Sequence, residues 1–299
     1  RHWEWQRKLA DALAHAGRGA EAGPAYLALA AASSGPEQID LRRRAAHAFL
    51  AAGLFEQGYA VVEAVLAAVG TRYPRTPRGR LLALLWQRAR LWARGYRFRC
   101  AAGPVAPADR TKLEAYWTAF VAMGNTDNLR ALGFATRHLR LALRVGDPKH
   151  LALGFAGEAF VIGAEPALRP RARRFLDTAA ELAARTPDPY PRALISVVAA
   201  FLTVMQGRWR ETVALADAAL ALCRRECPGA LPETFNALLS AVHALFHLGA
   251  LGDLAARLPP LLREADDRGD VLLYVLLRTG CCNAAWLAAD DPGGARAEA

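Results

Sequence analysis

Two cysteines and two histidines have the residue types that bind zinc. Cys223 and Cys227 are followed, after fifteen residues, by His243 and His247, and two such pairs form a tetrahedral site when a fold brings them together. The segment that carries the histidines is expected to be helical. About 11 helical residues, rising about 1.5 Å each, would place His243 about 17 Å from the turn after the cysteines. One ion cannot reach both pairs, so we expect no metal site and interpret these residues as packed sulfurs and helix-end histidines.

Three kinds of catalytic site can be considered from the sequence: a phosphate loop, a kinase catalytic loop and a reactive thiol. A Gly-rich phosphate loop ending in Lys-Ser or Lys-Thr is absent, and so is the catalytic-loop signature of protein kinases. Cys281 and Cys282 lie in an apolar segment that is expected to be helical, and no histidine partner for a catalytic thiol can be identified. We therefore expect a segment with no enzymatic activity and no cofactor.

The cysteines and the hydropathy pattern bear on the compartment. There are five cysteines, an odd count, and their spacing is not that of a disulfide framework, which fits a reducing cytoplasm. No secretory signal is recognisable. The longest uncharged stretches, residues 193–207 and 234–252, are either short for a membrane span of about 20 residues or amphipathic. We therefore predict a cytoplasmic chain without a membrane helix.

The most uneven feature of the sequence is its charge. The net charge is +10, and nearly all of it comes from the interval between Glu63 and Asp109, which contains no acidic residue. Aromatic residues, including Trp86 and Trp92, are interleaved with the arginines of this interval. These arginines are the candidate partner-binding residues: Arg72, Arg75, Arg78, Arg80, Arg88, Arg90, Arg94, Arg97 and Arg99.

Arginine interleaved with aromatic residues is compatible with three roles. It can dock an acidic protein surface or a neighbouring domain, it can form an ordinary solvated face, or it can hold phosphates and stack on nucleic-acid bases. We favour the docking surface, and nucleic acid is the least expected partner. Within the helix expected over residues 78–95, the predicted buried face, with its tryptophan in the core, consists of Leu81, Leu82, Leu85, Ala89 and Trp92.

The elements that must position these residues are helices separated by short turns. Alanine and leucine, both strong helix formers, dominate the composition. Gly207 and Gly249 lie 42 residues apart, Gly17 and Gly53 lie 36 apart, and Gly95 follows Gly53 by 42. A short turn about every 40 residues, with a helical segment on each side, indicates stacked helix hairpins.

The segments around these turns have helical periodicity. Apolar residues recur at spacings of three and four over residues 194–205 and 235–246, and each series forms one face of a helix. A single hairpin cannot bury such a face alone, so the stack is the folding unit. The predicted fold is all-α: a right-handed α-solenoid of about 14 helices in tandem antiparallel hairpins. We expect hairpins over residues 1–95, an irregular loop over 96–108, and hairpins with a period near 42 over 109–299.

Several passages resemble known helical repeats. Residues 17–22, with Tyr26 and Ala28 downstream, resemble the turn and second helix of a tetratricopeptide repeat. The 42-residue units are longer than the usual repeat of about 34 and are similar to variant repeats in the sensor arms of large bacterial signalling ATPases, including the maltose-regulon activator type.

Three further passages extend the resemblance. Residues 72–78, residues 115–117 with 125–128 and 136–138, and residues 263–265 with 268–270 resemble the C-terminal helical region of bacterial multidomain serine/threonine kinases. In that family a kinase domain and a signalling ATPase module precede the helical region. The resemblance therefore implies a longer polypeptide, of which this chain is a segment without chemistry of its own.

Three functions of different class remain open. The first, which we favour, is a non-catalytic scaffold or signal-sensing arm that binds a protein or peptide, including the kinase and ATPase modules of the same polypeptide. The second is a small-ligand sensor, which would need an apolar pocket within the superhelix. The third is a nucleic-acid-binding solenoid that uses the basic segment 72–99, with an affinity that falls steeply with salt.

Overall fold

The computed structural model describes residues 2–71, 73–74, 76–101, 103–124 and 127–298. Within these ranges the chain forms α-helices, two short 3-10 helices (Pro166–Leu168 and Gly280–Asn283) and no strand. The helices are α1 (His2–His15), α2 (Gly19–Ala31), α3 (Gly35–Ala51), α4 (Phe55–Ala68), α5 (Pro77–Arg94), α6 (Pro107–Met123), α7 (Asn128–Val145), α8 (Pro148–Gly163), α9 (Arg169–Ala183), α10 (Tyr190–Val204), α11 (Trp209–Glu226), α12 (Leu231–His247), α13 (Leu251–Arg268), α14 (Val271–Arg278), α15 (Ala284–Ala288) and α16 (Pro292–Glu298).

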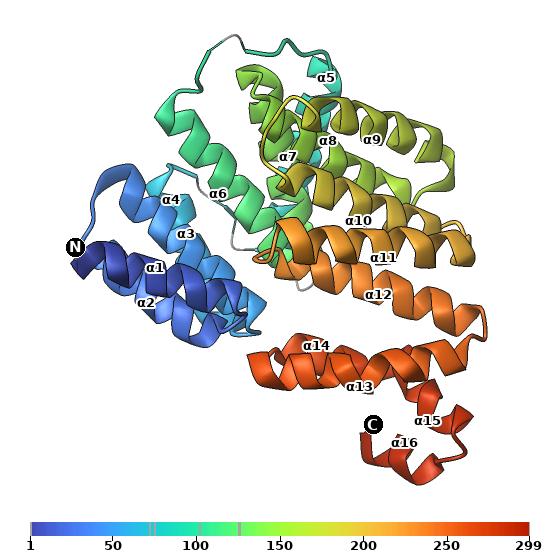
Figure 1. Cartoon of the computed structure of the whole chain (residues 1–299). Coiled ribbons are helices and arrows are strands. Elements are labelled where there is room, and N and C mark those ends of the chain that lie inside the picture. The colour runs from blue at the N-terminus through green and yellow to red at the C-terminus, as the bar shows by residue number, and fades with distance from the viewer. Residues whose placement is uncertain (1, 72, 75, 102, 125–126, 299) are drawn as a thin grey trace.

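These helices pack as a solenoid of antiparallel hairpins, which confirms the predicted fold class. Most helices pack on the next one along the chain, and contacts of α3 with α6, α8 with α10, and α10 with α12 join neighbouring hairpins. Figure 1 shows α1–α4 as one arm, α6–α9 as the middle of the stack, and α10–α16 as the other arm. The two arms curve toward the same side of the molecule, and this curvature forms its concave face.

Four of the turn glycines end a helix in the same way. Gly17, Gly53, Gly207 and Gly249 have φ values between 68° and 78°, a backbone region that favours glycine. The amide after each glycine donates to a carbonyl five positions earlier, which is one of the two bonds of a Schellman motif. The repeat in the sequence is therefore a repeat of one turn geometry. These bonds are 2.9–3.1 Å long and run from Arg18 to Leu13, Leu54 to Phe49, Arg208 to Thr203, and Ala250 to Leu245.

The turn at Gly95 leads to a different structure. Its φ is 74°, but its ψ of −179° sends the chain into an extended segment, and no described residue between Gly95 and Pro107 is helical. This loop lies over α8 and α9, because Tyr96 packs on Phe155 and Phe175 with ring centroids 6.5 and 4.7 Å apart. The residues that would form the second helix of the α5 hairpin therefore cover α8 and α9 instead.

α5 lies against α7 with its polar side and leaves most of its apolar side exposed. Only Leu84 and Leu91 are buried on this helix. Arginine ion pairs and hydrogen bonds also hold this side against α7, the segment before it and α8, and Leu91 joins the main apolar core. The predicted buried face, with its tryptophan in the core, is wrong, because all five positions are exposed: Leu81, Leu82, Leu85, Ala89 and Trp92.

Three clusters form most of the apolar core of the described residues. The largest joins α3 and α4 to α6–α10, so it crosses the loop between α5 and α6. A second lies within the N-terminal arm, and a third lies among α10–α15. The apolar faces predicted on α10 and α12 contribute to these cores through Leu194, Val198, Leu238 and Val242. Among the described helices, none combines the length and the low polarity that a membrane crossing requires.

Gly146 provides a test of the position of the loop. It ends α7 with a φ of 81°, and a Cβ atom here would collide with the carbonyl oxygen of Arg99 in the loop. Gly249 has a φ of 69° and open space around it. In both alanine variants the positive φ strains the backbone, but only the new Cβ of Gly146→Ala displaces the loop. We expect Gly146→Ala to lower the free energy of unfolding by about 1–3 kcal/mol more than Gly249→Ala. Urea unfolding measures the difference, and equal losses would contradict the prediction.

Candidate functional site

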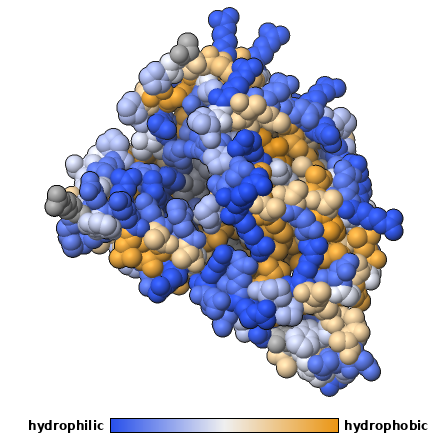
Figure 2. Space-filling model, in the orientation of Figure 1, coloured by the Kyte–Doolittle hydropathy of each residue, from blue (hydrophilic) through white to orange (hydrophobic). Residues whose placement is uncertain are grey.

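A cleft of about 1030 Å³ lies on the concave side of the solenoid, between the N-terminal arm and α6, α8, α10 and α12. Figure 2 shows the surface hollowed beside the N-terminal arm, with hydrophilic side chains around the hollow. Rim residues such as Glu37, Arg110 and Pro228 are exposed, whereas Leu41 and Trp117 in the lining are buried. The cleft is therefore open to solvent on one side and closed by packed helices on the other.

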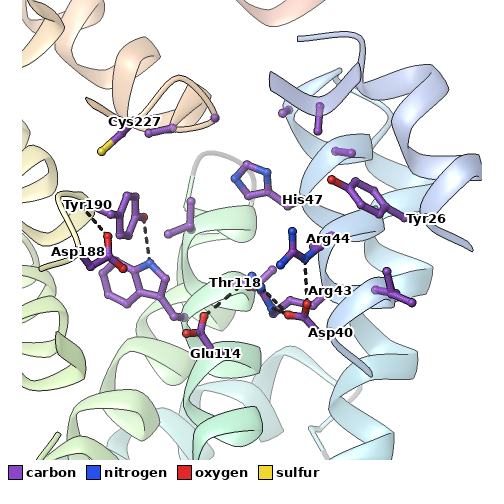
Figure 3. Close-up of a pocket in the computed structure, with 18 of the residues that line it drawn as sticks. Tyr26, Asp40, Arg43, Arg44, His47, Glu114, Thr118, Asp188, Tyr190 and Cys227 are labelled. Carbon is purple, nitrogen blue, oxygen red and sulfur yellow. Dashed lines mark hydrogen bonds and ion pairs between the residues drawn. The ribbon is translucent and has the colours of Figure 1, made fainter. Parts of the chain in front are cut away.

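Charged side chains form a continuous chain of ion pairs along the wall of the cleft, and Figure 3 labels Asp40, Arg43, Glu114 and Asp188 among them. Arg43 of α3 contacts Asp40 at 2.7 Å and Glu114 of α6 at 3.9 Å. Lys149 of α8 contacts the same Glu114 at 3.6 Å and Asp188, which precedes α10, at 2.8 Å. We name these five residues the charge strap. It links the N-terminal arm to the middle of the solenoid and to the segment that leads into α10.

Glu114 is the centre of the charge strap and is ionised at neutral pH. Burial alone would raise its pKa, but the hydrogen bond from His150 and the charges of Arg43 and Lys149 hold the pKa well below the usual range. His150 Nε2 lies 3.5 Å from Glu114 Oε1, and His150 Nδ1 lies 3.2 Å from Nε2 of His138. Burial, and then the neighbouring His150, lower the pKa of His138 well below its ordinary value. The His138 imidazole is therefore neutral at pH 7.

His47 of α3 lies in the cleft beside the charge strap (Figure 3). Burial, and then the charge of Arg43, lower its pKa to about 4, so the imidazole is neutral at pH 7. Arg44 on the same helix pairs with Asp11 of α1 at 3.1 Å, and Asp11 accepts a hydrogen bond of 2.7 Å from the Tyr26 hydroxyl of α2. Polar contacts among α1, α2 and α3 therefore fix the N-terminal side of the cleft.

The opposite side of the cleft contains a buried carboxyl group. Glu233 of α12 accepts a hydrogen bond of 2.5 Å from the Tyr190 hydroxyl, and it forms no ion pair with any residue that the structure describes. Trp117 Nε1 donates to the Tyr190 oxygen at 3.0 Å. Burial raises the pKa of Glu233, and burial followed by the charge of Glu233 raises the pKa of Tyr190. Burial also raises the pKa of Cys227 to about 11, so this lining residue is a thiol at pH 7.

One of the candidate arginines is engaged inside the protein. Arg88 of α5 donates two hydrogen bonds, of 2.7 and 2.8 Å, to the carboxylate of Glu158 on α8. The Tyr96 hydroxyl donates a third bond of 2.7 Å to the same carboxylate. Because Glu158 is only 3% exposed, these bonds satisfy a buried charge. We name these three residues the α5 anchor.

The structure places the other candidate arginines in different surroundings. Arg80 pairs with Asp127 at 3.2 Å, and Arg94 donates to the carbonyl of Leu143 at 2.8 Å. Both contacts hold α5 against α7 or the segment before it. Arg72 and Arg75 lie outside the described residues. The remaining described candidates lie on the surface with their side chains exposed, as the side chain of Arg94 also is: Arg78, Arg90, Arg97 and Arg99.

α7 adds arginines that the sequence analysis did not single out. Arg140 donates a hydrogen bond to Gln87 of α5, and Arg144 pairs with Asp109 at 3.1 Å. Arg137, Arg140 and Arg144 follow one another at spacings of three and four. This spacing is the signal in the sequence that could have placed them on one side of a helix. Together with the exposed arginines of α5 they form a second candidate surface, outside the cleft.

The cysteine and histidine pairs lie in different surroundings. Cys223 is buried near the end of α11, whereas His247 stacks on Trp209 with ring centroids 4.4 Å apart. Among the residues that the structure describes, no group of three or more His, Cys, Asp or Glu is arranged to hold a metal ion. Cys281 and Cys282 lie in a 3-10 helix rather than in the expected α-helix, because α14 ends at Arg278 and the following Thr279 has an extended backbone, with a φ of −119° and a ψ of 173°.

The comparisons with known proteins suggest no function, so a function has to be argued from the two surfaces. No protein-family model matches the chain, and no curated protein matches it. The wall of the cleft contains paired charged side chains, and apolar residues lie among them. The α5 surface offers arginines beside exposed apolar side chains.

The α5 anchor gives a prediction about stability. Arg88→Met leaves the buried Glu158 carboxylate without a cation, so we expect the free energy of unfolding to fall by about 3–5 kcal/mol. Adding Glu158→Met should recover much of the loss, since an apolar pair of similar volume needs no compensation. Arg78→Met is the control, because Arg78 is exposed, and it should change the free energy by less than about 0.5 kcal/mol. Urea unfolding tests all three, and similar values for Arg88→Met and Arg78→Met would refute the role of the anchor.

His47 gives a prediction about pH. Its pKa is about 4 in the folded chain, below its ordinary value of 6.5, so between these values the unfolded chain binds more protons. Stability should therefore fall as the pH is lowered from 6.5 toward 4. His47→Gln removes this titration, and the variant should lose less stability than the original chain over the same interval. Urea midpoints at pH 7, 5.5 and 4.5 provide the measurement, and parallel pH profiles would contradict the assignment.

Proposed function

We propose that this chain is a non-catalytic protein-binding segment of a larger signalling protein, and that its cleft holds a segment of a partner protein. The observation that carries the proposal is the lining of the cleft. Side chains from α1–α3, α6, α8, α10 and α12 converge on one concave surface. Such extended concave surfaces are the usual binding surfaces of helical-repeat proteins.

The chemistry of the lining favours a peptide over a highly charged ligand. In the charge strap, Arg43 and Lys149 are already paired with carboxylates, so little unpaired charge remains to attract a small ion. Apolar and aromatic groups such as Trp117 and Leu153 lie among these polar groups. An extended peptide presents backbone N–H and C=O groups along its whole length, so it can use polar partners that are spread out.

The sequence resemblance suggests the source of the partner segment. It implies kinase and ATPase modules on the same polypeptide, and these are the partners that we propose first. A small-ligand sensor is the second candidate. The observation that favours it is the volume of the cleft, because known ligand pockets measure about 300–1,000 Å³ and this one is at the upper end of that range.

Two threonines offer a matched test of the cleft. Thr111 of α6 lines the cleft, and Thr178 of α9 does not. Both are partly exposed, and both hydroxyls donate to the carbonyl four residues earlier, at 3.0 and 2.9 Å. Peptides are selected on the 299-residue chain from a random display library, and their affinities are measured by fluorescence anisotropy. We expect Thr111→Trp to weaken binding about tenfold or more because the indole fills the cleft, and Thr178→Trp to leave it unchanged.

Two outcomes would count against this function. Equal affinity for both variants and the original chain would mean that the cleft is not the binding site. If no peptide is selected, a small metabolite that raises the melting temperature of the original chain, but not that of Thr111→Trp, would establish the small-ligand sensor instead.

A further inference from the structure

α5 presents an apolar face to the solvent that no described element covers. Leu82, Trp86 and Trp92 are 67%, 63% and 64% exposed, and Leu81 and Leu85 are about half exposed. These residues form a stripe that runs along about 17 Å of the helix, at about 1.5 Å per residue. An apolar stripe that contains two tryptophans is typical of a protein-interaction surface.

The face is exposed because α5 lies beside the stack of hairpins and not within it. α3 and α4 pack directly on α6, and α5 packs mainly on α7. The chain after Gly95 continues into the loop that covers α8 and α9, so it adds no second helix beside α5. The side of α5 that faces away from α7 is therefore open.

Positive charge borders the apolar stripe on one side. Arg90 follows Trp86 by four residues and Gln87 by three, so it lies between the stripe and the side of α5 that faces α7. Arg137 and Arg140 of α7 continue the border, since Arg140 donates a hydrogen bond to Gln87. In the described part of the chain, none of these three arginines pairs with a carboxylate, and Arg90 lies over the Trp86 ring at 6.0 Å.

The arginines of the border are close enough to repel one another. Burial, and then the charges of Arg90, Arg137, Arg94 and Arg144, lower the pKa of Arg140. The Nε atoms of Arg137 and Arg140 are buried and have no hydrogen-bond partner among the described residues. Concentrated positive charge of this kind is unfavourable alone and is stabilised when carboxylates approach it.

We infer that α5 and the arginines of α7 together dock an amphipathic helix with an acidic face, supplied by a partner protein. The apolar side of that helix packs on Leu82, Leu85 and Trp86. Its carboxylates pair with Arg90 and Arg140. Tryptophan and arginine are the residue types that contribute most at such interfaces, and helix-in-groove docking is a recurring mode of recognition.

This surface is independent of the cleft. No residue of α5 lines the cleft, and neither do Arg137 and Arg140. The inference therefore goes beyond the proposed function and does not rest on it.

Charge argues against the other occupants of the stripe. A second copy of this chain would bring a second arginine border toward the first, because the interval between Glu63 and Asp109 contains no acidic residue. A flat membrane surface would meet the exposed Trp86, but not the partly buried Arg137 and Arg140 beside α5. A helix reaches both parts of the surface, because its side chains project in several directions from one axis.

The first experiment identifies the charge that the surface selects. Amphipathic helices of 18 residues, the length of α5, are displayed with leucine or alanine at the apolar positions. The polar positions vary among Asp, Glu, Lys and Gln, and the library is selected on the 299-residue chain. We expect Asp and Glu to be enriched at the polar positions. Enrichment of lysine, or no enrichment over the unselected library, would overturn the inference.

Variants of the chain then locate the binding site. Leu82→Ser/Leu85→Ser removes apolar groups from the stripe, and Arg90→Glu reverses the charge of its border. Leu9→Ser on α1 is the control, because Leu9 is 58% exposed and lies far from α5 in sequence. By fluorescence anisotropy, we expect each α5 variant to weaken the selected peptides about tenfold or more, with Leu9→Ser unchanged. Lysine-substituted peptides should regain affinity for Arg90→Glu.

Other results would assign the surface to a different occupant. Equal binding to all variants would place the peptides elsewhere. A dimer in sedimentation velocity that Leu82→Ser/Leu85→Ser dissociates would make the occupant a second copy. Tighter binding of phosphatidylglycerol vesicles or of a single-stranded oligonucleotide, lost in the same variant, would make it a membrane or a nucleic acid.

Thr111→Trp should leave the acidic peptides bound, so failure of the cleft proposal can be told apart from failure of this one.

Discussion

The buried ion pair between Arg88 and Glu158 decides which side of α5 faces the solvent. Glu158 is almost fully enclosed, and an ionised carboxylate there requires a cation and hydrogen bonds. Arg88 provides both and brings α5 against α8. Residues two apart on a helix lie about 160° apart, so with Arg88 directed inward, Trp86 is directed outward. The Tyr96 hydroxyl completes the set of bonds and fixes the start of the loop on α8 and α9.

Matched charge also lines the wall of the cleft. The wall that faces it consists of the charge strap, in which Glu114 lies between Arg43 and Lys149. These pairs face the solvent-filled cleft, and full burial would be costly, because a buried ion pair offsets the loss of its hydration only with near-ideal geometry. The contacts of Glu114, at 3.9 and 3.6 Å, are longer than such a geometry requires. The strap therefore joins the N-terminal arm to α6, α8 and the segment before α10, and the two arms also meet directly where Gly17 lies against Arg268 and Gly53 faces Val271.

Local signals in the sequence were sufficient for most of the fold and insufficient for the sites. The turn glycines and the apolar faces of α10 and α12 could be predicted, because each depends on residues within one hairpin. The orientation of α5 could not, because Arg88 depends on a carboxylate 70 residues away and apolar residues occupy more than one side of the helix. For the same reason, the candidate arginines could not be sorted into internal and surface residues. Sequence alone does not separate Arg88, which is engaged inside the protein, from Arg90, which is exposed.

The two surfaces share their supporting helices but not their residues. On α8, Lys149 and His150 lie beside Glu114 in the wall of the cleft. Glu158, about 12 Å farther along the same helix, binds Arg88 of α5. On α7, the neighbours Arg137 and His138 point to different sides, one toward the arginine border and one toward His150. A partner segment in the cleft and an acidic helix on α5 would therefore be held by the same packed helix pair at a fixed separation. Holding two partners in this way requires no chemistry of its own, and it is the task for which a stack of packed hairpins is suited.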